Sequence, residues 1–548
     1  MLSSALCFFF LYSTFFQLTA NALRLPTTQR RRLAPRTTSA VHFNYVNTLA
    51  AGGTSVGLRN DKDLIYMANV SIGGTSFGVQ LDTGSSDLWI QPGNVTIPGV
   101  TPTTLVQNIT YGIGWASGSV ATASVEFAGY TIPAQALLNV QLGDNPVLSY
   151  GASGILGLGF TSLSQIDGAV NRSVGLPNGN AWGRSFLWNC FAQNPSQPNY
   201  MTFALQRSTD PNASVKEGVF TIGEVDPAYS TVLNTNPIPT WPRSDPKRWT
   251  VLLAAYETGT STPQTPHFPP PSVVFTAPTG TAVILLDSGT SYTYAPSSMV
   301  TDIYGNVPGA YYSPAQGEWI VPCDAQVYVS FWIGGEKFDF HPLDVVAPSM
   351  TQSGTCIGTF IPQNLAAGSS DFDIIAGDVF LRNVYSLFDF GDFQSSSSSI
   401  MGNPYVKLYS TTNLTAASID FRAIRGGNAP LLESTNSSLA LGSLNSTPSS
   451  SDIITMFERY SIYVPVVLAV LGLNTLVLII MIIINIMNCR RRRARRRARA
   501  QQAAAAEVAS VGVGSHIIHS DPEINRTYAS SMDKEMSLRQ VASISTAT

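Results

Sequence analysis

The sequence predicts an all-β fold of two related lobes, followed by a single transmembrane helix and a disordered cytoplasmic tail. Three observations predict it. Between about residues 63 and 410, short apolar runs alternate with polar residues at a period of two, and Gly, Pro, Asn and Asp split them. Within this region a strand followed by Asp and a small-residue turn occurs twice. One long apolar run, residues 462–487, lies beyond it.

The composition limits the kinds of partner that the β region can have. Only 12% of the 548 residues are charged, and the net charge is −3. Eight arginines lie between Arg490 and Arg499, and without them 23 basic residues face 34 acidic ones. The body is therefore acidic, which argues against nucleic acid as its partner and suits an acidic compartment.

The N-terminal segment has the features of a secretory leader. Residues 1–22 hold an apolar core and end in Ala20-Asn21-Ala22, which fits a small-residue cleavage site. An uncleaved anchor is the alternative, but the apolar run is short for one. Residues 23–62 are polar, with a basic run at Gln29 to Arg32, and predict a zymogen's pro-segment. A merely solvated arm is the alternative for them.

The C-terminal part predicts a membrane anchor. Residues 411–461 are rich in Ser, Thr and Asn and are predicted to form a stalk. The apolar run 462–487 is long enough to cross a bilayer, and the arginines after it place residues 488–548 in the cytoplasm. A buried core helix is the alternative, but no globular core flanks it. The prediction is a single-pass type I protein, with its body outside the cell or in an endosome or vacuole.

Two further residue types fit an exported chain. Eight Asn-x-Ser/Thr sequons precede the predicted span and are predicted to be glycosylated. They are Asn69, Asn94, Asn108, Asn171, Asn212, Asn413, Asn436 and Asn445.

Cys7 leaves with the leader and Cys489 lies at the membrane edge, so three cysteines remain in an oxidising compartment. The simplest arrangement is one disulfide and one free thiol. No zinc-like Cys/His spacing occurs, so no metal or cofactor is predicted.

The repeated pattern places two carboxylates in equivalent positions. "FGVQLDTGSSDLWI" delivers Asp82 into a Gly/Ser turn, and "AVILLDSGTSYTYA" does the same with Asp287. Each is followed by a second apolar-Gly run, "SGILGLGF" and then "DIIAGDVF". This internal repeat predicts two lobes, residues 63–225 and 226–410, related by a pseudo-two-fold axis on which the two Asp residues meet. Two unrelated turn residues are the alternative.

Two adjacent carboxylates have a chemical consequence. They cannot both ionise easily, so they share a proton, and one then serves as base while the other serves as acid. A water molecule between them can attack an amide carbon. Gly84 and Gly289 let the backbone approach the carboxylates, and the hydroxyls of Ser85 and Thr290 can orient them.

At these residues the chain resembles the pepsin-like aspartic proteases, and the fungal members most closely. The resemblance covers about residues 63–410. It rests on "DTGSSDLW" (Asp82 to Trp89), "DSGTS" (Asp287 to Ser291) and "ITYGIGWASGSV" (Ile109 to Val120), which looks like the family's flap hairpin. The resemblance implies a bilobal fold, and an endopeptidase that is active in acid on extended peptides of proteins. It also implies a monomeric protease body.

The resemblance also implies roles for further residues. Tyr111 and Gly112 would form the tip of the flap, with Trp89 as the partner of the tyrosine; plain hairpin packing is the alternative. Thr83 and Ser288 would interlock beneath the two Asp residues. Cys323 and Cys356 would form the disulfide, which leaves Cys190 as a buried thiol or an intermolecular partner. A different class of function, a catalytically silent binding module on the same scaffold, would show a damaged dyad or flap, and the sequence shows neither.

Overall fold

The computed structural model describes residues 54–175, 182–208, 218–260, 266–366, 368, 370–393, 401–428, 430–433, 481 and 487. The chain divides into two units, residues 1–439 and 440–548. In the part that the structure describes, no helix is long and apolar enough to cross a bilayer. The predicted leader, almost all of the pro-segment and the tail lie outside the described residues, as does the span 462–487 apart from Met481 and Met487.

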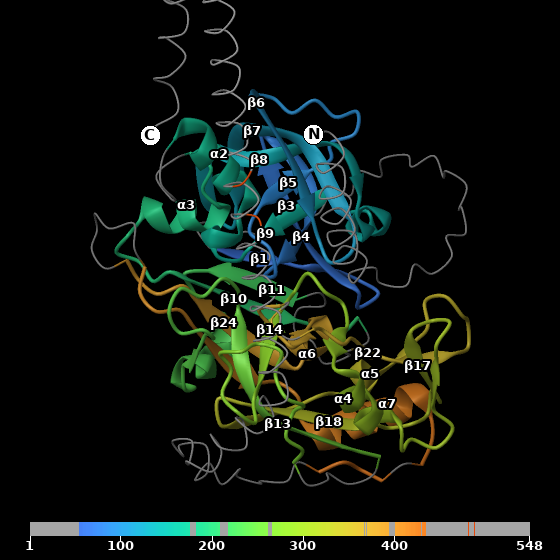
Figure 1. The fold of residues 1–548 in the computed structure, drawn as a ribbon. Coiled ribbons are helices and arrows are strands. Elements are labelled where there is room, and N and C mark those ends of the chain that lie inside the picture. The colour runs from blue at the N-terminus through green and yellow to red at the C-terminus, as the bar shows by residue number, and fades with distance from the viewer. Residues whose placement is uncertain are drawn as a thin grey trace, which may run out of the picture. The chain divides into compact units, whose positions relative to one another are not determined.

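An eight-stranded sheet forms the core of the N-terminal lobe (Figure 1). Its strands, in sheet order, are β2 (Arg59–Asp61), β3 (Ile65–Ile72), β4 (Thr75–Asp82), β9 (Gly154–Gly157), β5 (Leu88–Ile90), β8 (Tyr130–Asp144), β7 (Trp115–Phe127) and β6 (Thr101–Thr110). Along β7 buried and partly exposed residues largely alternate, as the period-two pattern of its sequence predicts.

A seven-stranded sheet forms the core of the C-terminal lobe (Figure 1). Its strands, in order, are β19 (Glu336–Asp339), β18 (Tyr328–Ile333), β13 (Thr250–Gly259), β14 (Ala282–Leu286), β23 (Ile374–Ala376), β15 (Thr293–Ala295) and β22 (Phe360–Pro362). The central strand β14 reads Ala-Val-Ile-Leu-Leu and is buried throughout, because both of its faces are covered.

A third sheet joins the two lobes. Its six strands, in order, are β1 (Ser55–Gly57), β11 (Gly218–Ile222), β10 (Tyr200–Leu205), β24 (Val384–Asp389), β25 (Tyr405–Ser410) and β12 (Ile238–Pro239). β10 pairs with β24 in antiparallel register, from Tyr200 opposite Asp389 to Ala204 opposite Tyr385. The predicted boundary at residues 225 and 226 therefore separates sequence halves that share one sheet.

A small sheet and short helices complete the described fold. The sheet runs β16 (Tyr311–Ser313), β17 (Glu318–Val321), β21 (Cys356–Gly358) and β20 (Val346–Pro348). The α-helices are α2 (Gln165–Val174), α3 (Phe186–Gln193), α4 (Ser297–Tyr304), α5 (Pro342–Val345), α6 (Asp378–Leu381) and α7 (Leu414–Arg425). The 3₁₀ helices are η2 (Pro146–Tyr150), η3 (Thr161–Leu163) and η4 (Pro227–Asn234).

The two lobes repeat one strand arrangement around their Asp turns. In the first, β4 pairs in parallel with β9, and β5 pairs antiparallel with the same β9. In the second, β14 pairs in parallel with β23, and β15 pairs antiparallel with β23. Both turns therefore leave their sheets in the same way, as the internal repeat predicts.

Three elements of the folded body lie outside the two protease lobes that the sequence predicts. Strands β1 and β2 lie in the predicted pro-segment, where β1 pairs with β11 and β2 with β3. Helix α7 lies in the predicted stalk. Its Leu414 and Phe421 are buried, and Leu432 after it packs with Leu414 and Tyr328. These buried side chains attach the segment to the folded body, whereas Ile419 and Ile424 of α7 are exposed.

The Pro-rich segment 257–275 begins within the sheet of the C-terminal lobe. Glu257 to Gly259 continue strand β13, and Glu257 is buried. Tyr328 and Trp332 donate hydrogen bonds of 2.9 Å to its carboxylate, and Lys337 lies 3.8 Å from it. These long-range partners, which its local sequence does not indicate, make the burial of this charge possible.

Candidate active site

The two predicted Asp residues meet where the lobes meet. Asp82 ends β4 and Asp287 follows β14 directly, and both are almost fully buried. In register, Asp82 lies opposite Gly157 of β9, and the Asp287 amide donates to the Ala376 carbonyl at 3.0 Å. Each carboxyl group is thus held at the end of a buried strand.

Two glycines allow the carboxyl groups to come together. A Cβ atom added at Gly84 would lie 2.5 Å from Oδ1 of Asp287, and one added at Gly289 would lie 2.2 Å from Oδ1 of Asp82. Real Cβ atoms do not approach oxygen so closely, so only glycine fits at either position. Each lobe's turn therefore lies directly against the carboxyl group of the other lobe.

Each carboxyl group accepts the same two hydrogen bonds from its own turn. The amide of Gly84 donates to Asp82 Oδ1 at 2.8 Å, and the hydroxyl of Ser85 donates to Asp82 Oδ2. The amide of Gly289 donates to Asp287 Oδ1 at 2.9 Å, and Thr290 Oγ1 donates to Oδ2 at 2.7 Å. These bonds fix both carboxyl planes without neutralising either one.

Thr83 and Ser288 bind the two turns to each other. Thr83 Oγ1 donates to the Leu286 carbonyl, and Ser288 Oγ donates to the Leu81 carbonyl, both at 2.8 Å. Each hydroxyl also accepts the other residue's amide, at 2.9 Å for Thr83 Oγ1 and 3.1 Å for Ser288 Oγ. This closed set of four buried bonds makes the distance between the lobes rigid at the dyad.

The hairpin of β6 and β7 carries Tyr111 to the first turn. Tyr111 and Gly112 lie at its tip, where the Tyr111 amide donates to the Gly114 carbonyl at 3.1 Å. Nε1 of the fully buried Trp89 donates to the Tyr111 hydroxyl at 2.7 Å. The structure therefore brings the predicted tyrosine and tryptophan together.

Burial and proximity govern the charge of the dyad. Removal from water raises the pKa of Asp82 well above its ordinary value, and the negative charge of Asp287 raises it further. The hydrogen bond from Ser85 lowers this pKa, but by less. Burial likewise raises the pKa of Tyr111 well above 10, and the Asp82 charge adds to this effect. The pair consequently holds a proton in acidic solution, and Tyr111 stays neutral.

The remaining predicted residues have varied outcomes. Cys323 and Cys356 form the disulfide, which confirms the prediction, and Cys190 is a buried free thiol. Asn94, Asn108 and Asn413 are exposed and Asn69 is half-buried, whereas Asn212, Asn436 and Asn445 lie outside the described residues. Asn171 is buried, and its amide donates to Asp167 at 3.0 Å. A glycan does not fit there in this fold, so that site is wrong.

Sequence reasoning missed two side chains beside the dyad. Asp87 lies in the first motif and is buried at the start of α2, where the amides of Gln165 and Ile166 and the hydroxyl of Ser164 donate to it. Burial raises its pKa to about 6. Arg248 donates from Nη1 to the Gly84 carbonyl at 3.1 Å. The sequence offers one signal for Arg248. It is a charged residue directly before a tryptophan, in a chain that has few charges.

Asp378, in the apolar-Gly run that follows the second turn, contacts that turn through its backbone. It is fully buried, and neither of its side-chain oxygens has a hydrogen-bond partner among the described residues. Burial raises the pKa of Asp378 well above its ordinary value, with opposition from Arg382 and support from Asp287. Its backbone amide donates to the Thr290 carbonyl at 2.8 Å. Asp378 therefore supports the turn of Asp287 through its backbone.

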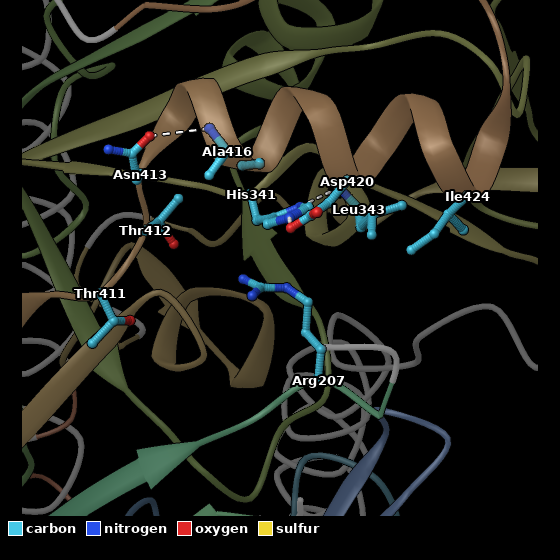
Figure 2. A pocket seen from close by; sticks show the side chains of 10 residues that line it. Arg207, His341, Leu343, Thr411, Thr412, Asn413, Ala416, Asp420 and Ile424 are labelled. Atoms are coloured by element: carbon cyan, nitrogen blue, oxygen red, sulfur yellow. Dashed lines mark hydrogen bonds and ion pairs between the residues drawn. The ribbon is translucent and has the colours of Figure 1, made fainter. Parts of the chain in front are cut away.

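A cavity of about 200 Å³ lies in the C-terminal lobe, beside α7. Figure 2 shows His341 and Asp420 facing each other across it, with Arg207 pointing toward them. His341 Nε2 is 3.8 Å from Asp420 Oδ2. None of its lining residues belongs to the Asp turns, so it is separate from the dyad. Within the described segments, no group of His, Cys, Asp and Glu is placed to hold a metal ion.

Comparison with known proteins agrees with this geometry. A family model described as eukaryotic aspartyl protease matches residues 65–399, more than half of the chain. The "Aspartic protease" of Phaffia rhodozyma is 26% identical, over 62% of this chain and 78% of its own. The "Aspartic-type endopeptidase ctsD" of Aspergillus fumigatus is 25% identical, over 75% of this chain and 78% of its own. The solved aspartic proteinase from Irpex lacteus is 20% identical with a TM-score of 0.49, and covers 66% of this chain and 99% of its own.

Proposed function

The chain belongs to the eukaryotic aspartyl protease family, and from this premise we propose that it hydrolyses peptide bonds of extended protein segments at acidic pH through Asp82 and Asp287. As an aspartic-type endopeptidase it acts on peptides. The observation that carries the mechanism is the close approach of the two carboxyl groups, each held by one amide and one hydroxyl of its own turn.

The proposed reaction uses a single shared proton. The ionised carboxylate takes a proton from a water molecule as the water oxygen bonds to the amide carbon. The protonated carboxyl donates its proton to the carbonyl oxygen, which gives a neutral tetrahedral intermediate. The proton gained by the base then passes to the amide nitrogen as the carbon–nitrogen bond breaks. At the same time one hydroxyl of the intermediate gives its proton to the other carboxylate, which re-forms the carbonyl and restores the singly protonated pair. Both the raised pKa of Asp82 and the proximity of Asp287 support this sharing in acid.

We also propose where the enzyme works. The run 462–487 anchors it as a single-pass type I protein, with a monomeric, glycosylated body at the cell surface or in an endosome or vacuole. The arginines after that run and the seven sequons before it other than Asn171 support this orientation. The leader 1–22 directs export, and removal of the pro-segment activates the zymogen. Strand β1 pairs with β11 and so forms part of the body, which supports a processing site before that strand.

The experiment replaces one carboxyl group of the dyad. In Asp287→Asn no second carboxylic acid remains to share the proton, so cleavage of casein between about pH 3 and 5 should fall by roughly 10⁴-fold or more. Asp245→Asn is the matched control, because Asp245 is exposed and has a positive φ that Asn also tolerates. The control should keep full, pepstatin-sensitive activity.

Two outcomes would contradict the proposal. A folded Asp287→Asn chain with undiminished acid proteolysis would remove the dyad from the mechanism. A folded, processed wild-type chain that cleaves nothing over that pH range would favour the catalytically silent binding module instead.

A further inference from the structure

We propose that Arg248 recognises a carboxylate side chain of the substrate next to the scissile bond, which makes this enzyme selective for acidic peptides. The inference rests on the proposed function, because it assigns a substrate class to the same site. Arg248 lies two residues before strand β13, which begins at Thr250.

The backbone at Arg248 is fastened to the first Asp turn. The next residue, Trp249, is fully buried, and its Nε1 donates to the Leu158 carbonyl at 3.1 Å. The Leu158 amide in turn donates to the Asp82 carbonyl at 2.8 Å. Arg248 therefore has a fixed starting point beside the dyad, although it belongs to the other lobe.

The guanidinium group of Arg248 contacts Gly84, the residue of the first Asp turn that packs against the Asp287 carboxyl. Its Nη1 donates to the carbonyl of Gly84 at 3.1 Å. Gly84 itself contacts the carboxyl of Asp287 so closely that a Cβ there would lie 2.5 Å from Oδ1. A peptide whose scissile carbon lies between the two carboxyl groups can therefore pass near the Arg248 charge on one side of that bond.

Arg248 keeps hydrogen-bonding capacity for a ligand. Its Nε is buried and has no hydrogen-bond partner among the described residues, whereas 28% of the side chain is exposed and open to a ligand. The Asp371 carboxylate lies 3.9 Å from Nε, which is an ion pair but too long for a hydrogen bond, and Asp371 is 56% exposed. The ring of Phe372 lies 5.8 Å from the guanidinium carbon. An incoming carboxylate can displace Asp371 without stranding a buried charge.

The geometry of an extended substrate fits this contact. Residues of an extended chain advance by about 3.4 Å each, so a side chain one or two residues from the scissile bond can reach Arg248. Carboxylate is the group that the guanidinium fork binds best, because charge and hydrogen bonds add. A substrate Glu has an ordinary pKa of about 4.3, so its advantage over Gln should exist above that pH and fade below it.

The test compares peptides that differ by one charge. A parent peptide cleaved by the enzyme is made with Glu or Gln at each position within three residues of the scissile bond, on both sides. We expect kcat/KM at about pH 5.5 to be roughly 10-fold higher for Glu at one position on one side. At about pH 3.5 that ratio should fall toward one, because the substrate Glu is mostly protonated there.

Substitutions test whether Arg248 causes the higher kcat/KM of the Glu peptide over the Gln peptide. In Arg248→Met the Glu-to-Gln ratio at the preferred position should fall to about one, whatever happens to the Gln peptide. Arg243→Met, at an exposed arginine, is the matched control and should keep the wild-type ratio. Asp371→Asn removes the competing carboxylate and should raise the ratio, which gives a second readout if Arg248→Met folds poorly.

Each outcome decides a different statement. A wild-type enzyme that cleaves the Gln peptides in a dyad-dependent way, but prefers Glu nowhere, overturns the recognition by Arg248 and leaves the proposed function intact. A ratio that persists in Arg248→Met, or is unchanged in Asp371→Asn, also overturns it. Failure to cleave every peptide contradicts the proposed function itself, and this inference with it.

Discussion

At the level of single residues, the site depends on small residues whose contacts lie in the other lobe, far away in the sequence. Gly84 and Gly289 matter because any Cβ would collide with the opposite carboxyl group. Thr83 and Ser288 matter because a hydroxyl both donates and accepts, so two of them can close a set of four bonds. Tyr111 contributes through Trp89, because its hydroxyl accepts the hydrogen bond from the indole N–H of that residue.

The hydroxyl of Tyr111 can be tested by itself. In Tyr111→Phe, Nε1 of the buried Trp89 loses its acceptor, and a buried donor without a partner costs about 1–3 kcal/mol. We expect a less ordered hairpin and a roughly 10-fold lower kcat/KM for peptide cleavage. Tyr312→Phe, at an exposed tyrosine, is the control and should leave kcat/KM unchanged. An unaltered kcat/KM in Tyr111→Phe would mean that the indole contact does not hold the flap.

At the level of elements, the sequence predicts the Asp turns better than the edges of the body. Each turn is marked locally by an apolar strand, an Asp and a small-residue run, and their equivalence follows from the repeat. Helix α7 leaves two of its isoleucines, Ile419 and Ile424, exposed, and the burial of its Leu414 depends on a distant partner, Tyr328 of β18. Arg248 acts through the carbonyl of Gly84, 164 residues earlier in the chain. No local pattern encodes such partners.

Helix α5 has a titrating cap that should make the fold sensitive to acid. His341 Nδ1 accepts the Leu343 amide at 3.1 Å, and burial, together with the charge of Arg207, lowers the His341 pKa to about 3. The Arg382 charge acts in the same direction, whereas Asp344 opposes it and Asp420 lies 3.8 Å away. An unfolded His has a pKa near 6.5, so between about pH 6.5 and 3 the unfolded chain binds more protons. Stability is therefore lost as the pH falls through this window.

The variant His341→Asn should remove that loss, because Asn keeps an acceptor for the cap but does not titrate. We expect the free energy of unfolding to fall less between about pH 6.5 and 3, by as much as about 4 kcal/mol. Asp344, whose pKa the two arginines lower to about 2, should still lose stability at lower pH in both proteins. Urea denaturation at each pH measures the slope, with His267→Asn as control. Parallel slopes for wild type and His341→Asn would contradict the buried neutral state of this histidine.

At the level of the whole molecule, buried ion pairs join strands that are far apart in the chain. Arg207, just after β10, forms an ion pair with Asp344 of α5 and donates to Asn383 at 2.7 Å. Arg382 binds the same carboxylate at 2.9 Å and reaches the Asp63 carbonyl at 2.9 Å. Thr411, at the start of the segment that leads into α7, donates its amide to Asn383 at 3.0 Å. Residues 411–433 are therefore part of this junction rather than a separate stalk.

The end of the folded body can be located by comparing two shortened chains. One ends at Glu433 and keeps α7, and the other ends at Ser410, where the sequence alone places the end of the protease. The shorter chain exposes the sites of Leu414, Phe421 and Leu432, each of which costs about 2–5 kcal/mol when its buried side chain is lost. We expect the longer chain to be secreted soluble and active, and the shorter one to be retained or to melt at a much lower temperature. Equal yield and equal Tm for the two would return residues 411–433 to the stalk. A Glu433 chain that sediments with membranes would contradict the proposed anchor at 462–487, because that run is missing from it.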